Sequence, residues 1–346
     1  MLLYLHIPFC NSKCYYCAFN SYINKFSKQK EYMEAITLQL KNELKRFNPK
    51  YGSIKSFFIG GGTPSTIKPH MYKKFFDILE PYLQKNAEIT VEANPNSTSL
   101  KWLKGMKKLG INRISIGVQS FDEIKLKKLG RNHTKNQAIE AVQNAHSIGI
   151  KNISIDLIYA TSFDVNSDLD IAFSLPINHI SSYALTLEKN TPFFKKIEFI
   201  DNSSKLANKF IKKVTSKFNQ YEISNFGEYQ SRHNLGYWRG DNYIGIGAGA
   251  VGFLKNERYY PYKNIEKYID KPLHVEVEKI SKSELNTEKI FLGLRSKVGV
   301  KKSILTTKQK LKTDILINEK KLTCKNEILY NSNFLLADEI TLYIIS

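Results

Sequence analysis

Three of the four cysteines in this 346-residue chain stand within eight residues, at Cys10, Cys14 and Cys17. A zinc site would need a fourth ligand in a second pair, and neither His6 nor the distant Cys324 has that spacing. Three thiolates suit a 4Fe-4S cluster better, because they leave the fourth iron open to the amine and carboxylate of a small molecule. The alternative is a disulfide or inert buried thiols, which such crowding in a cysteine-poor chain disfavours. The sequence therefore predicts a reactive cluster.

The length and the 42% hydrophobic content allow one large domain and a small appendage. No leader pattern opens the sequence, and its longest run of low polarity, 244–254, is too short and glycine-rich to cross a bilayer. Together with reduced thiols, these features predict a cytoplasmic protein.

The net charge of +20 would suit a nucleic acid or an acidic phospholipid surface. The lysines are spread over helix-like segments such as 101–108 and 205–217, which favours solvated helix faces and argues against a nucleic-acid partner. A peripheral membrane contact stays open, although no polybasic amphipathic anchor stands out.

Short apolar runs alternate with longer amphipathic segments up to about residue 190. Six runs predict strands, at 2–6, 54–59, 89–92, 113–118, 153–158 and 180–185. Helices are predicted at 27–47, 69–83 and 99–109. Because such alternation implies parallel strands with crossover helices, we expect an α/β fold, an incomplete (β/α)6 barrel.

Polar residues fall at the carboxyl ends of these predicted strands. Thr63 follows the second strand, Glu92 ends the third, Gln119 follows the fourth, Asp156 lies near the end of the fifth, and Arg131 lies in the loop beyond Gln119. Functional groups of parallel barrels gather at these ends. Each residue alone has a structural explanation, such as a helix cap, a turn or a surface charge. Their coincidence with the cysteine loop favours a common site.

The glycines at 60–62 follow the second strand. Without β-carbons they let the backbone come close to a ligand, although a glycine turn alone is weak evidence.

The Cys-x3-Cys-x2-Cys spacing, with Tyr16 just before the last cysteine, resembles the signature of the radical S-adenosylmethionine (SAM) superfamily. The preceding residues 4–9, Tyr-Leu-His-Ile-Pro-Phe, narrow the resemblance to the branch of oxygen-independent coproporphyrinogen III oxidases (HemN) and heme chaperones (HemW). The resemblance implies a partial (β/α)6 radical SAM barrel, a 4Fe-4S cluster on Cys10, Cys14 and Cys17, and bound SAM.

The same resemblance implies a nucleotide pocket in which a carboxylate holds the ribose and a guanidinium holds the methionyl carboxylate. The matching positions are Tyr4, Tyr16, Gly61, Gly62, Thr63, Glu92, Gln119, Arg131, Asp156 and Ala184. One departure follows the fifth strand, where Ala160-Thr161-Ser162 stands in place of the usual Gly-Leu-Pro, so we expect a different local turn.

The segment 232–239, Arg-His-Asn-Leu-Gly-Tyr-Trp-Arg, combines a histidine with aromatic and basic neighbours. A histidine can ligate heme iron, aromatic rings can cover the macrocycle, and arginines can pair with propionates. His-Asn-x2-Tyr-Trp resembles the segment associated with heme attachment in HemW, which makes His233 the expected axial ligand. The alternative is that His233 only hydrogen-bonds inside the fold, since the oxidases carry a similar segment. Val251 stands where relatives often have another histidine.

We expect three parts: a radical SAM core at 1–195, a barrel completion with the heme-binding segment at 196–280, and a small mixed α+β domain at 281–346 that lids the barrel mouth.

A heme chaperone that binds the cluster, SAM and heme, and delivers heme to acceptor apoproteins, is the favoured function. The oxidase is the alternative. It is disfavoured because Phe19 stands where oxidases carry another cysteine, and because Cys10 lies too close to Met1 for their N-terminal extension. A radical SAM enzyme acting on another small molecule is the third hypothesis. These residues leave open whether the protein is an enzyme and whether SAM is cleaved or only bound.

Overall fold

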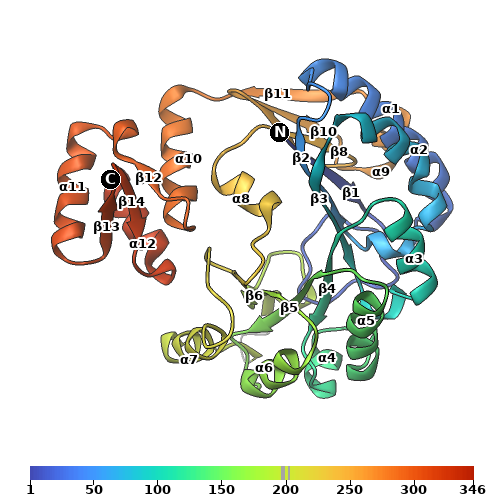
Figure 1. Ribbon diagram of the computed structural model, residues 1–346, viewed down its shortest axis with the longest axis horizontal. Helices are drawn as coiled ribbons and strands as arrows, with labels where there is room; N and C mark the ends of the chain where they lie inside the picture. The colour runs from blue at the N-terminus through green and yellow to red at the C-terminus, as the bar shows by residue number, and fades with distance from the viewer. Residues whose placement is uncertain (196–198, 202) are drawn as a thin grey trace.

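The computed structural model describes residues 1–195, 199–201 and 203–346. Within these ranges the chain forms a large sheet of order β11-β10-β9-β8-β1-β2-β3-β4-β5-β6-β7 and a small C-terminal sheet of order β12-β14-β13 (Figure 1). The strands of the large sheet are β1 (Leu2–Ile7), β2 (Ile54–Gly61), β3 (Leu83–Ala93), β4 (Arg113–Gln119), β5 (Asn152–Tyr159), β6 (His179–Ala184), β7 (Asn225–Gly227), β8 (Tyr243–Ile246), β9 (Gly252–Leu254), β10 (Glu257–Pro261) and β11 (Val275–Lys279).

The helices that accompany the large sheet are α1 (Gln29–Phe47), α2 (Pro69–Leu79), α3 (Leu100–Lys108), α4 (Glu123–Lys128), α5 (Lys135–Ser147), α6 (Val165–Ser174), α7 (Ser204–Val214), α8 (Arg232–Trp238) and α9 (Ile265–Asp270). The C-terminal unit contains α10 (Lys282–Leu294), α11 (Thr307–Asn318), α12 (Ala337–Ile345), β12 (Val300–Lys301), β13 (Leu322–Lys325) and β14 (Ile328–Asn331). None of the helices in the described ranges is both long enough and apolar enough to span a membrane.

Strands β1 to β6 pair side by side in parallel, which confirms the predicted α/β class and the six-strand partial barrel. The sheet continues past both ends of this set, because β7 adds antiparallel to β6 and β8 adds parallel to β1. These additions come from the range 196–280 that was expected to complete the barrel, of which residues 196–198 and 202 lie outside the described residues. The exact domain limits stay a prediction.

Two boundary predictions were wrong. The helix expected at 69–83 ends at Leu79, a single 3-10 turn covers Glu80–Tyr82, and Leu83 already begins β3. Pro81 explains the stop, because its ring has no backbone N–H to continue a helix. The strand β3 is also longer than the expected 89–92. Its first half contains the polar residues 84–86, so a search for apolar runs did not recognise it as a strand.

The chain between β4 and β6 forms α4, α5 and α6, which the sequence analysis did not assign. Their starts carry clear signals. Asp122 and Asp164 cap α4 and α6 through their side chains, and Thr134 with Gln137 forms a capping box at α5.

The two faces of the barrel strands differ in polarity. On β1, Leu3 and Leu5 are fully buried in the core that joins the sheet to the outer helices. Residues of the opposite, inner face include Ser56, Thr90 and Ser154, which are also fully buried. A polar inner face leaves groups that can bind a ligand or hydrogen-bond one another.

Helix α8 lies on the concave side of the sheet (Figure 1). The carboxylate of Glu88 in the middle of β3 accepts hydrogen bonds from the backbone N–H groups of Arg232 and His233, at 2.8 and 3.0 Å. The ring of His233 also pairs with Ser56 of β2. Because Ser56 lies five residues before Gly61, about 16 Å along the strand, α8 fills the amino end of the barrel.

The C-terminal unit has its own hydrophobic cluster and an antiparallel sheet, as expected for a small mixed domain. The backbone N–H of Ile223 donates to Arg295 O, and that of Lys297 donates to Tyr221 O, each at 2.9 Å. The unit therefore docks beside the segment before β7 and beside α8. The expectation that it covers the barrel mouth was wrong for the described residues, since none of the residues that line the mouth comes from it.

Candidate functional site

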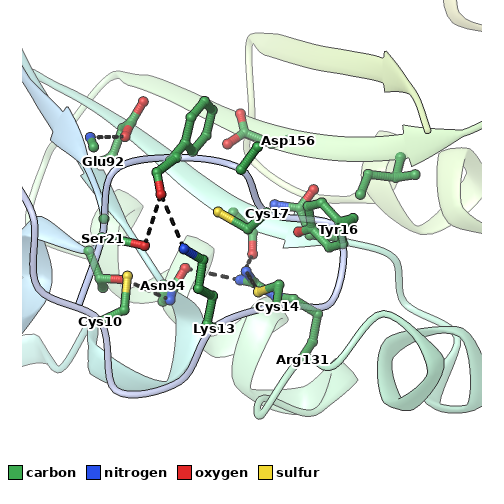
Figure 2. Close-up of a pocket in the computed structure, with 18 of the residues that line it drawn as sticks. Cys10, Lys13, Cys14, Tyr16, Cys17, Ser21, Glu92, Asn94, Arg131 and Asp156 are labelled. Carbon is green, nitrogen blue, oxygen red and sulfur yellow. Dashed lines mark hydrogen bonds between the residues drawn. The ribbon is translucent and has the colours of Figure 1, made fainter. Parts of the chain in front are cut away.

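The loop after β1 and the carboxyl ends of β2 to β6 enclose a cavity of about 430 Å³ (Figure 2). It brings together every sequence-predicted site residue except Tyr4 and His233. The shared lining residues are Cys10, Cys14, Tyr16, Cys17, Gly61, Gly62, Thr63, Glu92, Gln119, Arg131, Asp156 and Ala184. The carboxyl ends of the parallel strands converge here, as the sequence pattern predicted.

The cysteine loop is tied to the barrel by its backbone. Cys10 N–H donates to Tyr22 O at 3.0 Å, and Tyr22 N–H donates to Pro8 O at 2.7 Å. Farther along the loop, Tyr15 N–H donates to Leu129 O at 3.2 Å, just beyond α4. These contacts close the loop at its base and hold its middle against the next wall of the cavity.

The three cysteines of the loop are free, with Cys10 buried and the other two half-buried. Burial raises the pKa of the Cys10 and Cys17 thiols, so a bound metal centre must displace their protons. No set of three His, Cys, Asp or Glu side chains in the described ranges converges on a point that could hold a single ion. The ligands of a 4Fe-4S cluster need not converge on one point, because each thiolate binds a different iron. Three free soft donors around one cavity fit that group.

Polar partners reach two of the sulfurs. The Thr63 hydroxyl donates to Cys10 Sγ at 3.4 Å, and Arg131 Nη1 donates to Cys14 Sγ at 3.2 Å. Donors aimed at sulfur stabilise the negative charge that a thiolate carries as a metal ligand.

The glycine turn has a structural reason beyond access to a ligand. A Cβ on Gly62 would lie 2.9 Å from both Ile7 O and Phe9 O, and 3.0 Å from Cys10 Sγ. Gly61 has φ +113°, where a side chain is strained, and its N–H donates to Glu92 Oε2 at 3.0 Å. The turn therefore packs directly against the cysteine loop, and only residues without side chains fit there.

Two carboxyl groups, Glu92 and Asp156, face the cavity with different pKa values. Burial, followed by the negative charge of Asp156, raises the pKa of Glu92 to about 8. Burial raises the pKa of Asp156 less, to about 6, because the Ser115 hydroxyl donates to Asp156 Oδ1 at 3.0 Å and stabilises the charge. Near neutral pH, Glu92 is therefore mainly protonated and Asp156 mainly ionised, so the wall offers both a donor and an acceptor to ligand hydroxyls.

The Arg131 guanidinium is held by three acceptors of the protein itself. Besides Cys14 Sγ, it donates through Nη2 to Asn94 Oδ1 at 3.0 Å and to Gly117 O at 2.5 Å. Its position is therefore set by the protein before any ligand contributes.

Gln119, which lines the cavity, and Ala160, which lines the adjoining recess described below, adopt the left-handed backbone conformation that favours glycine. Gln119 has φ +67° and Ala160 has φ +61°. Ala160 is the first residue of the departure noted after β5, where the resemblance predicted glycine. The β-carbon makes this conformation cost about 1 to 2 kcal/mol.

Several cavity residues were missed by the sequence analysis, among them Lys13, Asn94, Ser115 and Tyr183. Asn94 follows Glu92 by two positions, at the same strand end, and this signal could have identified it. Ser115 lies inside β4, which a search restricted to strand ends does not reach, whereas Tyr183 directly precedes Ala184 at the end of β6 and could have been found there.

Tyr4 and His233 lie outside the cavity wall. The Tyr4 hydroxyl is 3.0 Å from His6 Nδ1. His233 Nδ1 is 2.8 Å from Ser56 Oγ, while its Nε2 is buried with no hydrogen-bond partner in the structure. Burial, and then the positive charge of Arg113, lowers the pKa of His233 to about 3, so its imidazole is neutral.

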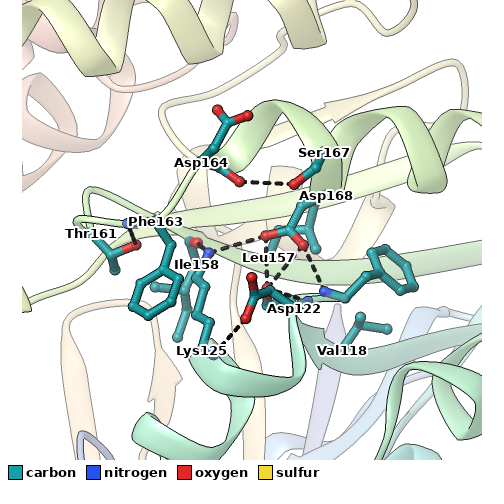
Figure 3. A network of polar contacts seen from close by, with 12 residues as sticks. Val118, Asp122, Lys125, Leu157, Ile158, Thr161, Phe163, Asp164, Ser167 and Asp168 are labelled. Carbon is teal, nitrogen blue, oxygen red and sulfur yellow. Dashed lines mark hydrogen bonds and ion pairs between the residues drawn. The ribbon is translucent and has the colours of Figure 1, made fainter.

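A buried ion pair supports the cavity wall from behind (Figure 3). Lys125 Nζ of α4 lies 3.1 Å from Asp168 Oδ2 of α6 and donates to Ile158 O at 2.7 Å. The other carboxylate contacts of Asp168 come from Ser120 Oγ at 2.9 Å and Phe121 N–H at 2.6 Å. The pair thus holds the end of β5 and the loop after Gln119, both of which border the cavity.

A second recess of about 550 Å³ adjoins the first and shares Ala184, Leu185 and Thr186 with it. The rest of its wall comes from the end of β5, the segments that follow β5 and β6, and the start of α7, and most of it is apolar.

Comparisons with known proteins agree with this geometry. The family model of the Radical SAM superfamily matches residues 4–170. The chain is similar to the heme chaperone HemW of Bacillus subtilis, 32% identical over 321 residues that cover 86% of this chain and 84% of that protein. It is also similar to HemW of Lactococcus lactis subsp. lactis, 34% identical over 350 residues that cover 95% of this chain and 90% of that protein.

The solved structure of coproporphyrinogen III oxidase (HemN) from Escherichia coli, a radical SAM enzyme, matches with a TM-score of 0.82. The match covers 99% of this chain and 89% of that chain at 18% identity, and it shows that the two share a fold.

Proposed function

This chain belongs to the radical SAM superfamily and, within it, to the family of HemW heme chaperones, and from this premise we propose that it binds a 4Fe-4S cluster, SAM and heme, and delivers heme to acceptor proteins. The relatives that carry the name heme chaperone match over most of their own length. The observation that carries the proposal is the single cavity around Cys10, Cys14 and Cys17 at the barrel mouth.

The proposed roles of the chain's own residues follow from their contacts. The three cysteines hold the cluster, which supplies one electron to SAM when bound. The glycine turn, Thr63 and Arg131 keep the cysteine loop and its sulfurs in place.

Glu92 and Asp156 present a donor and an acceptor for the ribose hydroxyls. The guanidinium of Arg131, which Asn94 and Gly117 hold in place, is the proposed partner of the methionyl carboxylate. Tyr16, Gln119 and Ala184 complete the proposed nucleotide wall.

Heme binding rests on His233. Its contact with Ser56 occupies Nδ1 and leaves Nε2 as the free ring nitrogen, and the neutral ring is the form that ligates iron. Because the side chain is only 1% exposed, ligation requires α8 to move away from β2.

An oxygen-independent coproporphyrinogen III oxidase is the second candidate, because the fold of HemN covers almost the whole chain. Phe19, which stands where the oxidases carry another cysteine, is 69% exposed at the rim of the cavity. A bulky apolar side chain there offers no ligand or proton donor, which favours the chaperone.

A hemin titration followed by the Soret band tests the proposal. We expect wild type to bind hemin, and His233→Ala to bind it with a changed Soret maximum and an affinity reduced by roughly tenfold or more. His179→Ala is the matched control, because His179 is equally buried but has both ring nitrogens occupied, by Ser154 Oγ and Tyr221 Oη. Hemin spectra that are the same in all three proteins would contradict the role of His233. Anaerobic decarboxylation of coproporphyrinogen III would favour the oxidase.

A further inference from the structure

We propose that Asn94 is a positioning residue that aims hydrogen-bond donors at two of the three cluster cysteines and thereby sets the reduction potential of the cluster. This inference rests on the proposed function, since it requires that the cluster binds at Cys10, Cys14 and Cys17.

One continuous chain of hydrogen bonds joins Cys10 to Cys14 through Asn94 (Figure 2). From Cys10 Sγ it runs through the Thr63 hydroxyl, which lies 3.2 Å from Asn94 Nδ2. From Asn94 Oδ1 it runs through Arg131 Nη2, at 3.0 Å, and from Arg131 Nη1 to Cys14 Sγ. The two sulfurs are therefore hydrogen-bonded by groups that meet at one amide.

The donor and acceptor roles within this chain are determined by chemistry. A guanidinium only donates, so the amide atom facing Arg131 must be the oxygen, and the amide nitrogen must face Thr63. The amide then donates to the hydroxyl oxygen of Thr63. Because a hydroxyl has a single proton, and its oxygen is already accepting from Asn94, that proton is directed to Cys10 Sγ.

The backbone of Asn94 is fixed independently of the sulfurs. Its N–H donates to Ser65 Oγ at 3.1 Å, and its carbonyl accepts from Ser97 N–H at 3.0 Å and from Thr98 Oγ1 at 2.7 Å. Such anchoring fixes the backbone from which the side-chain amide projects, which is what a residue that orients other donors requires.

The expected effect on the cluster follows from charge. A hydrogen bond to a ligand sulfur withdraws electron density and makes the reduced, more negative state of the cluster easier to reach. Loss of the amide therefore lowers the midpoint potential. The guanidinium is also no longer aligned, which weakens SAM binding if Arg131 supports its carboxylate.

Two substitutions at Asn94 separate the hydrogen-bond path to Cys10 from the path to Cys14. Asn94→Ala removes both bonds. Asn94→Asp keeps an acceptor for Arg131 but cannot donate to Thr63, and its carboxylate takes the hydroxyl proton away from Cys10 Sγ. Thr98→Ala is the matched control, because it removes a hydrogen bond to the Asn94 carbonyl without touching the path to either sulfur.

The full-length chain and the three variants are to be reconstituted anaerobically. The measurements are iron content, the midpoint potential from a redox titration monitored by electron paramagnetic resonance, the SAM dissociation constant and the melting temperature. We expect Thr98→Ala to keep the wild-type potential, and both Asn94 variants to have a lower one. We expect SAM affinity to fall roughly tenfold in Asn94→Ala and less than threefold in Asn94→Asp.

If both Asn94 variants hold a full cluster with the same midpoint potential as wild type, the inference is overturned and the proposed function stays intact. A wild-type chain that holds no cluster would instead overturn the proposed function. If Asn94→Ala does not fold, the potential of Asn94→Asp decides. Loss of iron from both Asn94 variants at an unchanged melting temperature, with iron retained in Thr98→Ala, would overturn the inference, because it would show that Asn94 is needed for cluster binding and does not tune the potential of a bound cluster.

Discussion

Gly62 shows at the scale of one residue how the cysteine loop is positioned. The space for its missing side chain is filled by the carbonyl oxygens of Ile7 and Phe9 and by the sulfur of Cys10. Because two of these neighbours are backbone atoms at the base of the loop, they cannot move without moving the loop itself.

We therefore predict that Gly62→Ala lowers iron incorporation severalfold on anaerobic reconstitution, because the added methyl group displaces Cys10 from its place among the three ligands. The clash also lowers the free energy of unfolding, by about 1 to 3 kcal/mol. The measurements are iron and sulfide per chain, and urea unfolding.

Gly252→Ala is the control for Gly62→Ala. The nearest neighbours of a Cβ there lie at 3.3 Å, and the residue stands on β9, away from the cavity. Full iron content in Gly62→Ala would show that the close packing of the turn is unimportant for the cluster.

At the scale of elements, α4 and α6 act together through Lys125 and Asp168. Both side chains are essentially unexposed, and the hydrogen bonds of Asp168 to Ser120 and Phe121 complete the shell of the carboxylate. A pair of this kind need not add stability over apolar residues, but removing one partner leaves a buried charge uncompensated.

Asp168→Asn is therefore expected to lower the free energy of unfolding by about 3 to 5 kcal/mol. The double variant Lys125→Met/Asp168→Asn should lose less than the sum of its two single variants, since it leaves no lone buried charge. Urea unfolding of the metal-free protein measures both.

The surface pair Lys73–Asp77 is the matched control, at 2.8 Å but with both side chains more than half exposed. Asp77→Asn should cost no more than about 1 kcal/mol. Equal losses for Asp77→Asn and Asp168→Asn would refute the role given to burial.

At the scale of the whole molecule, several buried titratable groups have pKa values that burial shifts in opposite directions. Burial raises the pKa of Glu92 to about 8 and that of Glu222 to about 7. Burial lowers the pKa of His133 and of His233 to about 3. Both kinds of shift favour the neutral form in the folded state.

The pH dependence of stability follows with a definite sign. Above the ordinary carboxyl pKa of 4.5, unfolding releases the protons of Glu92 and Glu222, so stability falls as the pH rises towards 8. Below the ordinary histidine pKa of 6.5, His133 and His233 bind protons in the unfolded chain but stay neutral in the folded protein. Stability therefore also falls as the pH decreases towards 3. We predict a maximum between about pH 4.5 and 6.5, measured by urea unfolding of the metal-free protein.

Glu92→Gln should flatten the decline between pH 6.5 and 8, because an amide has no proton to lose. A wild-type stability that rises from pH 6.5 to 8 would contradict this account of the buried groups.

Some parts of the structure could be predicted from the sequence and others could not. The six strands were predictable because their apolar runs are bounded by turns, and the cysteine spacing pointed to the cluster by chemistry alone. The helices α4 to α6 were missed, although their caps are visible in the sequence. The end of α2 was misplaced because Pro81 was not given enough weight.

The sequence by itself determined the class of fold, the donor set of the site and the family, because these depend on local periodicity and on which side chains are present. Only the tertiary structure decided which residues meet. It joined Thr63, Asn94 and Arg131, from three separate strand ends and loops, into one path between two cysteines. It also placed His233 away from the cavity, in contact with Ser56. Such contacts depend on strand register and on the curvature of the whole sheet, and neither is encoded in any single segment.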